Sequence, residues 1–144
     1  MNITSPSSTS SSGVDEQVSP GLTREWLCDK RVVVYTLANV HRSTIDTWID
    51  AFKADILNWP ADQTYLVMHD FSTKKVDATP YGRHRAEELL WLRRELKGRA
   101  AIVLPHTIAA ALIQVFVRIA QTKGTPRVQQ VFTSRDAALK WLLS

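Results

Sequence analysis

Cysteine is almost absent from this chain, which contains a single cysteine, Cys28, in 144 residues. One cysteine cannot form an intrachain disulfide or supply the several thiolates of a cysteine-based zinc site. Domains stabilised by disulfides or by such a zinc site are therefore excluded. A lone thiol suits a reducing compartment, and the first residues show neither the basic nor the apolar part of a secretory signal. We therefore predict a cytoplasmic protein.

Long apolar runs are also scarce. The most apolar stretch, residues 100–120, is interrupted by Pro105, His106 and Arg118, whereas a membrane-spanning helix needs about 20 predominantly apolar residues. We therefore expect no membrane span. The sequence also lacks the G-x-G-x-x-G, P-loop and G-x-S-x-G motifs of nucleotide-binding proteins and serine hydrolases. We expect no cofactor, and we predict no catalytic residue.

The excess of positive charge is small. Lys and Arg number 18 and Asp and Glu number 14, which gives a net charge of +4. Basic residues gather on or beside the segment 83–99, but Arg83 with Glu87 and Glu95 with Arg99 are spaced as i,i+4 pairs, typical of a solvated helix face. We therefore expect no nucleic-acid partner.

Composition divides the chain into a tail and one domain. Six of the first twelve residues are Ser and two are Thr, and such a segment buries too little apolar surface to offset the entropy cost of ordering it. We predict a disordered Ser/Thr-rich tail over residues 1–22. The remaining residues, 23–144, are of a size typical of a single domain.

Within residues 23–144, β-branched runs alternate with segments of helical periodicity. The expected strands span residues 25–29, 31–37, 64–71, 99–104 and 127–132, and the expected helices span residues 43–59, 79–97, 107–123 and 133–143. Strands that alternate with helices form parallel pairs, whereas the first two strands are joined too tightly for a crossover and should pair antiparallel. The pattern predicts an α/β fold, order ββαβαβαβα, with a mixed, mainly parallel five-stranded sheet and four helices.

Two segments carry a resemblance to a known family. The first is Asp70-Phe71-Ser72 followed by Val76-Asp77-Ala78-Thr79-Pro80-Tyr81-Gly82, and the second is Arg127-Val128-Gln129-Gln130-Val131-Phe132 followed by Asp136-Ala137-Ala138-Leu139-Lys140-Trp141-Leu142. With the order of elements, they resemble the STAS domain of anti-sigma-factor antagonists and the broader SpoIIAA-like group, in particular its branch of unassigned function. The resemblance implies a SpoIIAA/STAS-like fold and a regulatory site at Asp70, Ser72, Asp77 and Thr79, with Thr79 at the phospho-acceptor position. The alternative is that Thr79 only caps the helix that follows.

Three histidines follow or end predicted strands. His41, His69 and His106 would then lie at the carboxyl edge of the sheet, where open α/β sheets bind ligands. Three imidazoles could hold a zinc ion, although their spacing matches no local ligand motif. The competing interpretation is that they are solvated loop residues.

The predicted helix 107–123 is apolar nearly all round. Ile108, Leu112, Val115 and Ile119 follow one side, and Ala109, Ile113, Phe116 and Val117 follow the other. Only one side can face the sheet, and the other needs a cover. The sequence leaves open which side that is. We predict a homodimer through this helix, with Leu112, Ile113, Phe116 and Val117 as candidate interface residues.

The function that these features favour is a non-catalytic regulatory or protein–protein interaction module that self-associates and has an unidentified protein partner. The alternative is a carrier of a small apolar or lipid-like ligand, which would require a closed apolar pocket beside the helix 107–123. A metal-dependent or hydrolase-like enzyme is the third interpretation.

Overall fold

The computed structural model describes residues 15–72 and 79–144, which form one six-stranded sheet with four helices. The strands are β1 (Asp15–Ser19), β2 (Leu22–Leu27), β3 (Val32–Leu37), β4 (Tyr65–Asp70), β5 (Gly98–Val103) and β6 (Arg127–Phe132), and the helices are α2 (Arg42–Asn58), α3 (Pro80–Leu89), α4 (Ile108–Thr122) and α5 (Arg135–Leu142). The strands lie side by side in chain order, from β1 at one edge to β6 at the other. Strands β1, β2 and β3 pair antiparallel, and β3, β4, β5 and β6 pair parallel. The predicted α/β class, mixed sheet and four helices are thereby confirmed.

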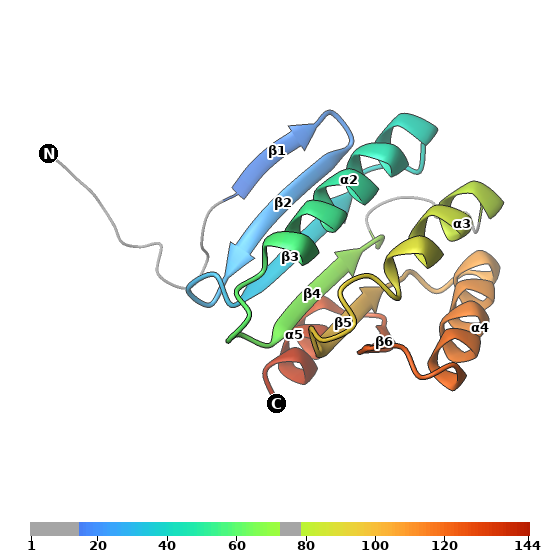
Figure 1. Ribbon diagram of the computed structural model, residues 1–144. Coiled ribbons are helices and arrows are strands. Elements are labelled where there is room, and N and C mark those ends of the chain that lie inside the picture. The colour runs from blue at the N-terminus through green and yellow to red at the C-terminus, as the bar shows by residue number, and fades with distance from the viewer. Residues whose placement is uncertain (1–14, 73–78) are drawn as a thin grey trace, which may run out of the picture.

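The helices cover the two faces of the sheet unequally. Helices α2, α3 and α4 lie on one face, and α5 alone lies on the other (Figure 1). Side chains alternate between these faces along each strand. On β4, Tyr65 and Val67 therefore join the cluster beneath α2, whereas Leu66 and Met68 join the cluster beneath α5.

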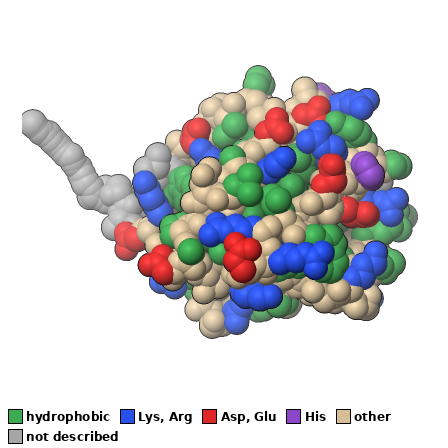
Figure 2. Space-filling model, in the orientation of Figure 1, with side chains coloured by type: hydrophobic (Ala, Val, Ile, Leu, Met, Phe, Trp, Pro, Cys, Tyr) green, Lys and Arg blue, Asp and Glu red, His purple; other side chains and the backbone are tan. Residues whose placement is uncertain are grey.

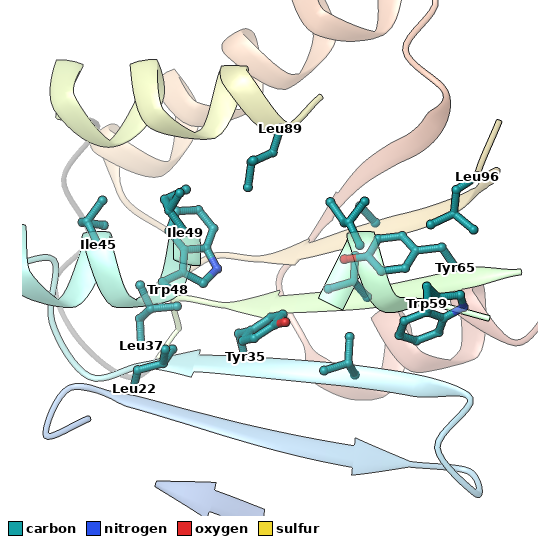
Figure 3. Close-up of a cluster of buried hydrophobic side chains, with 14 residues drawn as sticks. Leu22, Tyr35, Leu37, Ile45, Trp48, Ile49, Trp59, Tyr65, Leu89 and Leu96 are labelled. Carbon is teal, nitrogen blue, oxygen red and sulfur yellow. The ribbon is translucent and has the colours of Figure 1, made fainter. Parts of the chain in front are cut away.

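The larger core is aromatic and lies between α2 and the sheet. Trp48 and Ile49 of α2 are buried against Tyr35 of β3, and Trp59 contacts the Tyr65 ring edge-on at a centroid distance of 4.8 Å (Figure 3). Strands β3 and β4 each begin with four consecutive apolar residues because both faces of the sheet are covered there. None of the helices among the described residues is long and apolar enough to cross a membrane.

The sheet has one more strand than we predicted, and it lies in the segment assigned to the tail. Strand β1 spans Asp15–Ser19, and Leu22, which begins β2, is 1% exposed. The ordered domain therefore begins by residue 15 instead of residue 23. Strand β1 carries one apolar residue, Val18, which packs on the core, and so it lacks the alternating pattern that reveals a strand. It forms because β2 offers backbone groups for pairing. Residues 1–14 of the predicted tail lie outside the described residues.

Helix α3 ends at Leu89, eight residues before the predicted end at Lys97. Gly98, the residue after the predicted helix, is the first residue of β5. A Cβ atom at Gly98 would lie 1.9 Å from the carbonyl oxygen of Tyr65, so only glycine fits where β5 meets β4. Residues 90–97 form turns whose carbonyl groups are bound by a buried arginine, Arg127.

Candidate functional site

The predicted regulatory cluster begins at Asp70, the last residue of β4. Its carboxylate is 2% exposed, and Oδ1 accepts hydrogen bonds from the Ser72 amide at 2.9 Å and from the Ser72 hydroxyl at 2.5 Å. Arg135 at the start of α5 brings Nε to 3.5 Å from Asp70 Oδ2 and donates to Glu25 of β2 at 3.0 Å. The cluster therefore joins β2, the end of β4 and α5. Asp70 and Ser72 are hydrogen-bonded to each other, whereas Asp77 lies outside the described residues.

Thr79 is the N-cap of α3. Its Oγ1 accepts a hydrogen bond from the Gly82 amide at 3.1 Å, and Pro80 occupies the first helical position. Proline there suits the fixed φ of a first helical turn, because the amide it lacks would have no partner within the helix. The structure thus gives Thr79 the capping role that the sequence offered as the alternative to a phospho-acceptor.

The arginines near Thr79 already have partners. Arg85 lies 2.7 Å from Asp46 of α2 and 3.4 Å from Glu88 of its own helix. Arg83 stacks over the ring of Phe116 on α4, with Cζ 4.7 Å from the ring centroid, and lies 3.9 Å from Glu87. A phosphate on Thr79 would have to compete with these partners, so this part of the chain is not preorganised for one.

Substitutions at Thr79 separate capping from other roles. Thr79→Val should lower the free energy of unfolding by about 1 kcal/mol, because it removes the acceptor of the Gly82 amide. Thr79→Asp should have a free energy of unfolding at least equal to that of the native protein, since aspartate also caps and adds a favourable charge at the helix N-terminus. Urea denaturation followed by circular dichroism measures both. A loss of several kcal/mol for Thr79→Asp would contradict the capping role.

The structure does not bring the three histidines together. His41 is exposed at the N-terminus of α2 and His106 is exposed after β5, whereas His69 is 5% exposed on β4. Across residues 15–72 and 79–144, no group of three or more His, Cys, Asp or Glu side chains could hold a metal ion. The zinc interpretation gains no support.

His69 belongs to the aromatic core. Trp48 Nε1 donates to His69 Nδ1 at 3.1 Å, the Tyr35 ring stacks on the imidazole at a centroid distance of 5.7 Å, and Phe52 lies at 4.6 Å. Burial lowers the pKa of His69 to about 3, because the charged ring would lose its hydration. The ring is therefore neutral at pH 7 and serves as the acceptor for Trp48.

A shallow depression lies at the N-terminus of α4. Pro105, His106, Gln114 and Thr133 contribute to its lining, and it is wide open to solvent. The carrier interpretation requires a closed apolar pocket beside this helix, so the depression does not favour it.

One side of α4 carries exposed large apolar side chains. Ile108 is 92% exposed, Leu112 47%, Val115 45% and Ile119 50%. We call these four residues the α4 stripe. Hydrophobic side chains are visible over α4 at the right-hand end of the molecule in Figure 2. Single exposed apolar residues are ordinary, but four that adjoin along one helix are typical of an interaction surface.

The structure also shows which side of α4 faces the sheet. Ala110 is 3% exposed and packs with Ile113 on Leu104. Of the four residues predicted for the interface, only Leu112 belongs to the α4 stripe, while Ile113, Phe116 and Val117 are half-buried. Sequence reasoning did not choose between the two sides because both are apolar. The one sequence signal was that the sheet-facing side includes small Ala110, which permits close packing.

The arrangement offers a helix-capping threonine, a buried carboxylate bound by a serine and an arginine, and one uncovered apolar helix face. No model of a known protein family matches the chain, and neither a curated protein nor a solved structure matches it.

Proposed function

We propose that this protein is a non-catalytic regulatory or protein–protein interaction module with a SpoIIAA/STAS-like fold, and that it self-associates through the α4 stripe. The observation that carries the proposal is the exposure of four large apolar side chains along one helix. Each Å² of apolar surface removed from water stabilises an assembly by about 25 cal/mol. A cover for this face is therefore favoured.

The composition of α4 favours a second copy of the chain as the cover. The helix carries a single charged residue, Arg118, and no acidic residue. A strongly acidic or basic partner would gain little from such a face, whereas the same apolar stripe on another copy matches it. A two-fold interface buries both stripes at once.

Other features agree with an interaction role in a reducing compartment. Cys28 is a free thiol, which suits the cytoplasm. The clusters around Asp70 and Thr79 bind loops and helix ends to one another, which is a structural role. Regulation at Thr79 remains part of the proposal through the resemblance alone, and the α4 stripe is the surface on which a further protein partner would compete.

Replacing Leu112 by glutamate tests the proposal. The native protein should form dimers at tens of micromolar, whereas Leu112→Glu should remain folded and raise the dissociation constant at least tenfold, because dimerisation would bury a charge. Light scattering after size exclusion measures the mass, and circular dichroism checks the fold.

The matched control is Leu57→Glu. Leu57 lies on α2 and is 51% exposed, close to the 47% of Leu112. This variant should dimerise like the native protein. A native protein that is monomeric at 100 micromolar, or equal dissociation of the two glutamate variants, would overturn self-association through α4.

A further inference from the structure

The spacing of the α4 stripe is that of a two-helix seam. Its residues follow one another at intervals of four, three and four positions. These intervals keep side chains on one side of a helix and are the spacing with which coiled-coil helices interlock. The sequence 4-3-4 also reads the same in both directions. An antiparallel second copy therefore brings every stripe residue opposite another one.

We propose that two copies of α4 pack antiparallel, about a two-fold axis that passes between Leu112 and Val115. This inference rests on the self-association proposed above and specifies its geometry. Ile108 then lies opposite Ile119 of the second copy, and Leu112 lies opposite Val115 of the second copy. Each of the eight side chains in the seam gains an apolar neighbour.

Charges beside the seam favour the antiparallel arrangement over the parallel one. In a parallel pair, a residue beside the seam faces the residue five positions further along the other helix. Arg118 of each copy would therefore face Lys123 of the other copy. In the antiparallel pair, Arg118 instead lies beside Ala111 of the second copy, which is exposed and small. The parallel arrangement thus adds two repulsive contacts that the antiparallel one avoids. Antiparallel helix dipoles also attract each other weakly.

The seam is short, which limits its strength. Fifteen residues make a helix about 22 Å long, and an interface of this size falls in the class of weak or transient contacts. We therefore expect a dissociation constant in the micromolar range. Reversible dimerisation of this kind leaves the same face free for another protein.

Cysteine cross-linking distinguishes the two arrangements. In a Cys28→Ser background, Ile108→Cys and Ile119→Cys are made as separate proteins, the second labelled with ¹⁵N so that masses identify the products. Disulfides need Cα atoms about 4.4–6.8 Å apart. In the antiparallel pair, the two copies of position 108 are separated by about 16 Å along the helix axis alone, since eleven residues rise 1.5 Å each. Under mild oxidation, each protein alone should give only background cross-linking, and the mixture should give the mixed disulfide.

Lys53→Cys in the same background measures random collision, because Lys53 is exposed on α2. Efficient cross-linking of either protein with itself would overturn the antiparallel arrangement. Background levels in every combination, while the native protein still dimerises, would place the interface elsewhere and also overturn the inference. A monomeric native protein would instead refute the proposed self-association itself, so the two failures are distinguishable.

Discussion

The free energy of unfolding of the Arg127→Met variant should be at least about 3 kcal/mol below that of the native protein. Arg127 is 5% exposed at the start of β6, and burial lowers the pKa of its guanidinium. It donates to the carbonyl oxygens of Leu89 at 3.0 Å, of Leu96 at 3.1 Å and of Arg93 at 3.1 Å. Methionine fills much of the same volume but removes the guanidinium group that binds these carbonyl groups together. Urea denaturation at pH 7 measures the difference.

The physical reason is that one planar group binds the end of α3 and the turns after it. The carbonyl oxygens of Leu89 and Arg93 also accept the amides of Leu92 and Leu96, at 3.3 Å and 2.9 Å, so the variant loses the charged donor at these sites. Hydrogen bonds to a charged group contribute about 1.5–3 kcal/mol each. Arg127→Lys is the matched control, because an ammonium keeps the charge but cannot span all the acceptors. It should fall between the native protein and Arg127→Met. Equal stability of Arg127→Met and the native protein within 1 kcal/mol would show that the turns do not depend on this residue.

Acidification should destabilise the fold through His69. The pKa of His69 is about 3 in the folded protein, and about 6.5 in an unfolded chain. Because the folded pKa is the lower one, the unfolded state takes up the proton first. Stability is therefore full above about pH 6.5 and is lost as the pH falls from 6.5 toward 3. By pH 5 the loss should reach about 2 kcal/mol, at 1.36 kcal/mol for each pH unit.

Denaturation at pH 7.5 and pH 5.0 measures this loss, and His69→Asn is the control. The asparagine oxygen can replace Nδ1 as the acceptor for Trp48, but it does not titrate. The variant should be less stable than the native protein at pH 7.5, since it loses ring contacts with Tyr35 and Phe52. Its stability should nevertheless change much less between the two pH values. An equal drop in both proteins would assign the acid sensitivity to other groups.

Part of this architecture could be predicted from local pattern. The β-branched run in β3 and the helical periodicity of α2 each depend on neighbours within a few residues, so their positions followed from the sequence. Strand β1 and the end of α3 could not be predicted in this way. Strand β1 depends on pairing with β2, and the turns after Leu89 depend on Arg127, which lies 38 positions further along the chain.

The candidate site also has parts that local sequence predicts and parts that depend on the tertiary structure. The motif around Asp70 and the N-cap at Thr79 are local, and sequence reasoning placed them at the end of a strand and the start of a helix. The fate of His69 was not local, because its environment is made by Trp48, Tyr35 and Phe52 from two other elements. The local sequence around a histidine near the end of a predicted strand does not show whether its side chain faces solvent or an aromatic core.

The sequence by itself determined the α/β class, the mixed sheet and the presence of a helix with more apolar surface than one sheet face can cover. These properties follow from the periodicity of side chains along the chain, which is set by the geometry of strands and helices. Only the tertiary structure decided that Ile108, Leu112, Val115 and Ile119 face outward while Ala110 and Ile113 face the sheet. Both sides of α4 are apolar, so the choice rests on how closely each can pack against Leu104 and β6, which is a property of the assembled fold.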